Sequence, residues 1–319
     1  MKLALKMFAL GGSALFLVLS ADALPDDRSS RKQEPICTPT AEKTSECSVL
    51  LLQGTTQDSG KTEGKKKRGF LISWLHMAAE TQTHQPDWLS PLATTSGRLK
   101  QEFRYDIWEQ PSTMVNRTYQ FGGNKGLEFI TSPRTQILLG VPTYTLVSPS
   151  GPSGGFGDLP LQLKFRIASA ERSEGNYLLT FILAATAPTG SHRYGAGDGV
   201  VTPTIAAGKG FGRLDVQSTF GANLPTGNTT KLGRQLQWNT AFQYQAAWKL
   251  WPELEVNSTF YRTGPRSGEQ QVFLTPGLGF GRVRLRKGFR FSSGAGLQIA
   301  VTRFHTYNHR WMFSERISF

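Results

Sequence analysis

Residues 235–249, QLQWNTAFQYQAAWK, decide the fold class of this chain. From position 236 to position 244 every second residue is Leu, Trp, Thr, Phe or Tyr, and the residues between them are Gln, Asn or Ala. A period of two places successive side chains on opposite faces of a β-strand. The segment therefore has one apolar face, with aromatic residues near both ends, and one polar face, which no helix of this sequence would have.

The same alternation recurs along most of the chain. Leu159, Leu161, Leu163, Phe165 and Ile167 are interleaved with Asp158, Gln162, Lys164 and Arg166. Applied from residue 98 onward, this pattern predicts strands at 98–108, 125–131, 135–146, 158–169, 177–187, 200–208, 213–224, 234–249, 253–262, 270–282, 289–302 and 309–319. Most of them approach the roughly 9 to 11 residues that a tilted strand needs to cross a bilayer.

The connections between these strands alternate in length, which favours a barrel. Short turns such as 132–134 and 250–252 alternate with long loops that contain 151–155 and 188–190. With an even strand count and both chain ends on one side, all short turns fall on that side, as in outer-membrane barrels. A soluble β-sandwich is the alternative, but its strands are usually shorter. A sheet in lipid must close, because open edges leave unpaired backbone groups.

These observations predict an all-β protein, a transmembrane antiparallel β-barrel of twelve strands, with roughly 10 to 14 compatible with the pattern. Residues 98–319 are expected to form the barrel. Residues 1–23 are expected to be a secretory signal peptide, because two lysines precede the uncharged run 7–21 and the run closes on the A-x-A pattern Ala21-Asp22-Ala23. Export favours a location in the cell outer membrane of a Gram-negative bacterium.

Residues 24–97 are polar and lack a sustained period, so they are expected to be a largely flexible periplasmic tail. Cys37 and Cys47, the two cysteines of the chain, are candidates for one disulfide in an oxidising compartment. The basic run 65–68 is interpreted either as a solvated charge cluster or as a contact with anionic lipid. The apolar residues that follow it, 70–75, suggest a short interfacial helix.

The net charge of +13 would suit a nucleic acid, an anionic membrane or an acidic solute. Export excludes nucleic acid as a partner, which leaves outer-membrane lipid and a small-molecule solute. The final strand places Trp311, Phe313, Ile317 and Phe319 on one face, which resembles the C-terminal signal that the barrel-assembly machinery recognises. Glu315 departs from that pattern, because the same parity turns a carboxylate toward lipid.

Several short motifs resemble one family of outer-membrane proteins. They are Gly157-Asp158-Leu159, Ala187-Pro188-Thr189-Gly190, Asn223-Leu224-Pro225, Trp251-Pro252-Glu253-Leu254-Glu255 and Leu274-Thr275-Pro276-Gly277-Leu278. This set is similar to the family named for transport in the meta-pathway of phenol degradation, over residues 98–319. The resemblance implies an outer-membrane channel for small molecules, aromatic ones among them.

Strand parity also predicts which side chains line the lumen. The candidate pore-lining residues are Glu102, Arg104, Asp158, Lys164, Arg166, Arg213, Asp215, Gln237, Gln243, Glu255, Arg290, Arg310 and Arg316. A basic excess in a pore raises the local concentration of anions, which predicts passive passage of small solutes with a weak preference for anions. The same ion pairs and amides also fit a closed structural or ligand-binding barrel that does not conduct.

An enzyme is the less favoured class of function. Outer-membrane hydrolases that act on lipids use a Ser–His pair, and proteases of this membrane use Asp and His. The five histidines are His76, His84, His192, His305 and His309. None lies in a phospholipase-like sequence, and His305 and His309 fit residues of the barrel rim. No catalytic residue, metal site or cofactor is expected.

Overall fold

The computed structural model describes residues 69–111, 116–123, 125–148, 153–191, 193–246, 249–285 and 288–319. The expected signal peptide, most of the expected tail, both cysteines and His192 lie outside the described residues. The first described element is helix α1 (Phe70–Thr83). No helix among the described residues is both long and apolar enough to cross a membrane.

The described chain after α1 is one antiparallel sheet with short helical turns η1 (Arg172–Glu174) and α2 (Thr229–Leu232). Its strands are β1 (Glu102–Pro111), β2 (Arg117–Gly122), β3 (Gly126–Ser132), β4 (Thr135–Gly140), β5 (Tyr144–Ser148), β6 (Ser153–Phe156), β7 (Leu159–Ala170), β8 (Tyr177–Ala187), β9 (Val200–Phe211), β10 (Leu214–Pro225), β11 (Gln235–Tyr244), β12 (Leu250–Tyr261), β13 (Gln270–Arg284), β14 (Arg290–Ala300) and β15 (His309–Ser318).

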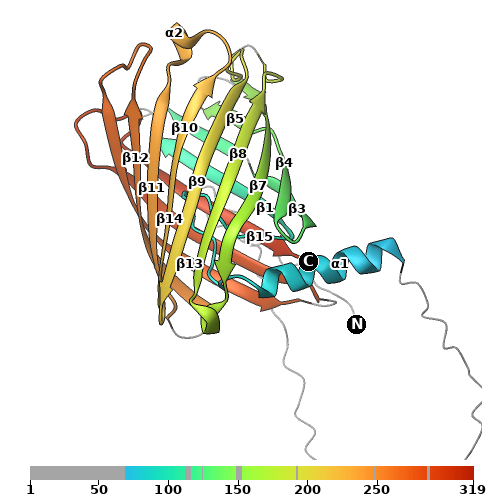
Figure 1. Cartoon of the computed structure of the whole chain (residues 1–319). Coiled ribbons are helices and arrows are strands. Elements are labelled where there is room, and N and C mark those ends of the chain that lie inside the picture. Colours follow the sequence, from blue (N-terminus) through green and yellow to red (C-terminus); the bar gives the residue numbers. More distant parts are fainter. Residues whose placement is uncertain are drawn as a thin grey trace, which may run out of the picture. The chain divides into compact units, whose positions relative to one another are not determined.

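The sheet closes into a barrel of twelve strands, as the sequence predicts (Figure 1). The ring runs from β1 through β3, β4 and β7 to β15, and β15 pairs with β1 from Glu109↔Trp311 to Glu102↔Ser318. Strands β2, β5 and β6 are not separate members of this ring. They continue the ring strands β3, β4 and β7, respectively, beyond a break in each. Beyond these breaks the sheet goes on in the same order, since β2 pairs with the second half of β1, β5 pairs with β2, and β6 pairs with β5.

The breaks in these strands have causes in the sequence. Gly122, the last residue of β2, and Gly123, which follows it, have φ values of +104° and +59°, which favour glycine. A Cβ at Gly123 would lie 2.7 Å from the Cβ of Asp106, so the two strands approach too closely there for a larger residue. Pro142, between β4 and β5, has no backbone N–H to donate to the ladder.

The two faces of the barrel wall have the predicted chemistry. On β7 the side chains of Leu161, Leu163 and Phe165 are 38 to 44% exposed, whereas those of Lys164 and Arg166 are buried. The outward face of the other strands is also apolar, with Phe181, Phe220, Phe242 and Trp311 exposed. Short turns such as 133–134 and 212–213 lie at one end, and the longer loops 188–199 and 226–234 lie at the other.

Helix α1 lies at the end of the barrel where β15 ends (Figure 1). Its Trp74 side chain donates a hydrogen bond to the carbonyl oxygen of Ile130 on β3 at 2.7 Å. Ala78 packs against Leu99 and Ile130. The helix suggested by residues 70–75 is therefore present, and Phe70 is 87% exposed, but contact with lipid stays a prediction.

Residues 84–101, which we call the plug, lie inside the barrel rather than in a flexible tail. Trp88, Leu89, Leu92 and Leu99 are each less than 5% exposed, and most polar residues between them are buried as well. The prediction of a largely flexible tail is therefore wrong for this part of residues 24–97. Long-range hydrogen bonds fix the segment, and the local sequence pattern does not show them.

Candidate functional site

Buried polar side chains line the inner face of the barrel and meet the plug. They come from nearly every part of the ring and include Glu128, Gln136, Lys164, Thr180, Asp215, Gln217, Gln243, Glu253, Glu255, Gln298 and Arg316. Buried polar groups require hydrogen-bond partners. In this barrel most of the wall residues find those partners in one another and in the backbone of the plug.

Two carboxylates of β12 hold the centre of the plug. The Glu255 carboxylate accepts hydrogen bonds from the backbone N–H groups of Ala93 at 2.8 Å and Thr94 at 2.6 Å. The Glu253 carboxylate accepts one from the N–H of Leu92 at 3.2 Å. Three consecutive peptide groups of the plug are thus bound by side chains of a single strand.

Three and four strands round the ring from β12, on β15 and β1, cationic side chains bind the plug's carbonyl groups. Arg104 on β1 donates to the carbonyl oxygens of Pro91 at 3.1 Å and Leu92 at 2.7 Å, and Arg316 on β15 also donates to Pro91 at 3.1 Å. Arg104 is held in place by a bidentate pair with Asp106, in which both N–O distances are 2.8 Å. The wall thus offers acceptors to the plug's N–H groups and donors to its C=O groups.

The remaining contacts extend around the wall. Gln217 on β10 donates to the carbonyl oxygen of Leu89 and accepts from the Ser96 hydroxyl, and Thr180 on β8 donates to the carbonyl oxygen of Gly97 at 2.8 Å. Lys164 on β7 donates to the carbonyl oxygen of Arg98 at 3.3 Å. Because these contacts come from strands on all sides of the ring, the plug crosses the lumen from wall to wall.

A buried charge cluster lies beside the C-terminal part of the plug. The Lys164 ammonium is 3.2 Å from the Glu128 carboxylate, and Lys100 is 3.1 Å from Glu102. Burial lowers the pKa of Lys100 to about 8, and the negative charges of Glu102 and Glu128 oppose that shift. Burial likewise lowers the pKa of Arg98 to about 10.

Inward glycines make room for the plug's apolar side chains. A Cβ on Gly279 would lie 2.2 Å from a methyl carbon of Leu89, and a Cβ on Gly277 or Gly296 would approach Leu92 within 2.7 Å. A Cβ on Gly208 would lie 2.6 Å from the ring of Trp88. These glycines are a signal in the sequence that could have indicated an object inside the barrel.

The structure turns most predicted pore-lining residues inward. Glu102, Arg104, Lys164, Arg166, Asp215, Gln243, Glu255 and Arg316 are buried. Gln237 and Arg310 are half-buried, and the Arg310 guanidinium lies 4.1 Å from the ring centre of Trp108. Since the plug fills this space, these residues contact the plug and one another, and a role in lining a pore stays a prediction.

The other three predicted residues lie at or near the ends of the barrel. Arg213 is exposed in the turn between β9 and β10, where it lines a small pocket with Asp87 and Trp88 of the plug. Asp158 lies between β6 and β7 and accepts hydrogen bonds from the backbone N–H groups of Gly190 and Ala196, which fixes the β8–β9 loop. Arg290 is exposed at the start of β14, where it lines a cavity between the plug and the wall.

The side-chain contacts of His305 and His76 are local. His305 bonds to the carbonyl oxygen of Thr302 at 3.0 Å and to the Asn308 side chain at 2.7 Å, within the β14–β15 loop. His76 lies 3.9 Å from Glu80 on α1. Within the described ranges, no group of three or more His, Cys, Asp or Glu side chains is placed to hold a metal ion.

The fold and the site together define a class of protein: a closed twelve-stranded barrel with an apolar exterior and a polar interior crossed by its own N-terminal segment. No family model and no curated protein matches the chain. Among solved structures, it is similar to an outer membrane channel from Pseudomonas putida F1, with 16% sequence identity and a TM-score of 0.46. The similarity covers 73% of this chain and 100% of that one. The resemblance to the phenol-degradation family stays a prediction.

Proposed function

We propose that the protein is an outer-membrane channel for small solutes, held closed by the plug in the structure described here. The band of exposed Leu, Ile, Phe and Trp side chains around the barrel supports a membrane location. In water such a surface would promote association, whereas in lipid it is solvated. A closed antiparallel barrel also leaves no strand edge unpaired, which a bilayer requires.

The observation that carries the proposal is the way the plug is bound. Glu253, Glu255, Arg104 and Arg316 all contact the plug through its backbone, by hydrogen bonds. Water can replace each of these bonds once it enters a polar lumen. A plug bound in this way can leave while the barrel wall remains folded, and its departure would open a water-filled path lined by charged and amide side chains.

The resemblance noted in the sequence suggests small aromatic molecules as solutes, and the basic excess suggests anions. We further propose that the chain's tail lies in the periplasm and that the last strand, with Trp311 and Ile317 facing outward, is recognised by the barrel-assembly machinery. The competing function is a closed ligand-binding barrel that does not conduct. This alternative is favoured by the number of strands around the ring that bind the plug.

Single-channel recording in planar lipid bilayers tests the proposal. The chain without residues 1–23 is compared with Glu255→Gln, which weakens the bonds to Ala93 and Thr94, and with Glu269→Gln, a matched control in the exposed β12–β13 loop. We expect rare openings for the unmodified chain and the control, and at least tenfold more frequent openings for Glu255→Gln. If none of the three folded proteins shows channel openings, the result would favour the closed barrel.

A further inference from the structure

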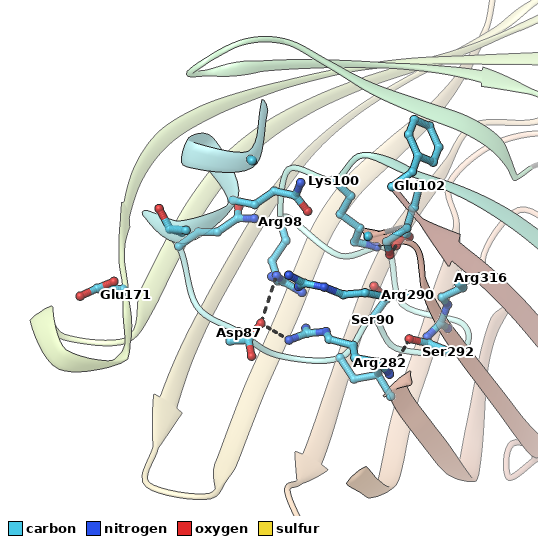
Figure 2. A pocket seen from close by; sticks show the side chains of 18 of the residues that line it. Asp87, Ser90, Arg98, Lys100, Glu102, Glu171, Arg282, Arg290, Ser292 and Arg316 are labelled. Atoms are coloured by element: carbon cyan, nitrogen blue, oxygen red, sulfur yellow. Dashed lines mark hydrogen bonds and ion pairs between the residues drawn. The ribbon is translucent and has the colours of Figure 1, made fainter. Parts of the chain in front are cut away.

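A cavity of about 790 Å³ lies between the plug and the barrel wall, at the end where the C-terminal strand ends (Figure 2). The plug contributes Asp87, Ser90 and Arg98 to its lining. The wall contributes arginines from three consecutive strands, β13, β14 and β15. These are Arg282, Arg290 and Arg316. The cavity is therefore built from both the plug and the wall. Its charged lining is basic in balance, with Arg98, Lys100, Arg172, Arg282, Arg290 and Arg316 against Asp87, Glu102 and Glu171.

The positive charge in this cavity is only partly neutralised. Asp87 forms an ion pair with Arg282 and lies 3.9 Å from Arg98, but its side chain is 80% exposed. Figure 2 shows the side chains of Arg98, Arg282 and Arg290 pointing toward one another beside it. Arg290 lies near enough to both other arginines for their charges to repel. The side chain of Arg290 has no hydrogen bond or ion pair with any residue of the described ranges.

Buried donors in the same cavity also have no acceptor. Arg316 is 2% exposed, and of its guanidinium nitrogens only Nη2 has a partner, the carbonyl oxygen of Pro91. Its Nε and Nη1 are unpaired, and so is Nε of Arg98, which is 7% exposed. An unsatisfied buried donor costs free energy, and a charged one costs more. The cavity therefore offers N–H groups and positive charge to a ligand that has several acceptor oxygens.

We infer that this cavity binds a small oxyanion, phosphate or carboxylate, between the plug and the wall. A guanidinium group presents N–H donors in a planar fork that matches the oxygens of either anion. One bound oxyanion would separate the like charges of Arg98, Arg282 and Arg290. It would also lie near the positive charge of Arg316, and so join the plug to β13, β14 and β15.

The site exists independently of conduction, although its influence on the plug rests on the proposed function. An oxyanion that contacts Arg98 from one side and Arg290 from the other stabilises the closed position of the plug. The oxyanion group could belong to a free solute or to a lipid headgroup, and both present the same chemistry to the arginines. The test therefore has one arm for each source.

Calorimetric titration of the detergent-solubilised protein with inorganic phosphate, and separately with benzoate, tests the free solutes. Native mass spectrometry after exposure to phosphatidylglycerol tests the lipid. Arg290→Gln is the decisive variant, because this side chain holds no other described residue in place. Arg134→Gln is the matched control, because Arg134 is exposed in the β3–β4 turn at the same end of the barrel and does not line the cavity.

We expect saturable binding of at least one of these three probes. We expect Arg290→Gln to weaken it at least tenfold and Arg134→Gln to leave it unchanged. The probe that binds identifies the source of the oxyanion. The inference is overturned if none of the three binds the folded protein, or if Arg290→Gln and Arg134→Gln bind with the affinity of the unmodified chain. Because binding is measured without a bilayer, its outcome is separate from that of the conductance experiment.

Discussion

The carboxylate of Glu255 accepts a hydrogen bond from the backbone N–H of Thr94 at 2.6 Å, although 161 residues separate the two in the sequence. Glu255 is fully buried and its second oxygen accepts from Ala93, so one side chain of the wall orders two consecutive peptide groups of the plug. A buried carboxylate needs such partners, and the plug supplies them. The wall and the plug therefore stabilise each other.

Replacing Glu255 with Gln should loosen the plug without unfolding the barrel. The amide keeps one acceptor oxygen but loses the charge, so the bonds to Ala93 and Thr94 weaken by about 1 to 3 kcal/mol. We expect the N–H groups of both residues to exchange with deuterium about 10 to 100 times faster, while exchange on β12 is unchanged. Glu269→Gln is the control, and equal exchange in the two variants would show that the carboxylate does not hold the plug.

Leu163 tests the outward face of the barrel. It lies beside Ile137 on β4 and Leu183 on β8, and all three side chains are exposed. Leu163→Arg should destabilise the barrel in lipid by about 2 to 4 kcal/mol, because it places a charge in the hydrocarbon region. Urea unfolding in lipid vesicles measures the change, with Ser267→Arg in the β12–β13 loop as the control. A loss of less than 0.5 kcal/mol, on the order of an ordinary surface substitution, would contradict the lipid-facing assignment.

The strands could be predicted because an apolar outer face and a polar inner face impose a period of two on a strand. On β7, Leu161, Leu163 and Phe165 lie on the outer face, and Lys164 and Arg166 lie on the inner one. The ends of the strands could be predicted less well than the strands themselves. Arg213 was placed at the first position of a strand, but Gly212 has a φ of +63° and forms a turn in which Arg213 is exposed. A shift of one or two residues at a strand end is enough to move a side chain out of the lumen.

The plug could not be predicted from its own sequence. It is neither helix nor strand over most of its length, so it has no period. Its backbone groups are satisfied by Glu253, Glu255, Gln217 and Arg104, and only the closed ring brings these residues near it. The apolar residues Trp88, Leu89 and Leu92 were the available local signal, together with the inward glycines that face them.

The ion pair between Glu128 and Lys164 predicts that two substitutions lower the free energy of unfolding by different amounts. The two side chains are 3.2 Å apart and almost fully buried, and Lys100 also faces Glu128. Glu128→Gln should cost about 3 to 5 kcal/mol, because it leaves both lysines without that counter-charge. Lys164→Met should cost less, since Lys100 still faces the carboxylate. Urea unfolding of the single variants and of the double variant completes a double-mutant cycle, and additive losses would show that the pair is not coupled.

Lys100 predicts how stability depends on pH. Burial lowers its pKa from 10.5 to about 8, against the opposing effect of Glu102 and Glu128. Between these two pH values the unfolded chain binds more protons at this residue than the folded chain does. The free energy of unfolding should therefore rise with pH over this range, by at most about 1.4 kcal/mol per pH unit for one such group.

Lys100→Met should reduce this slope, because the residue no longer titrates in either state. The slope should not vanish, since burial also lowers the pKa of Arg98, in the plug, to about 10. Urea unfolding at pH 8, 9 and 10 measures the slope, and Lys231→Met in the exposed turn α2 should leave it unchanged. If the slope of Lys100→Met equals that of the unmodified chain, Lys100 keeps its ordinary pKa, and the space around it must admit water.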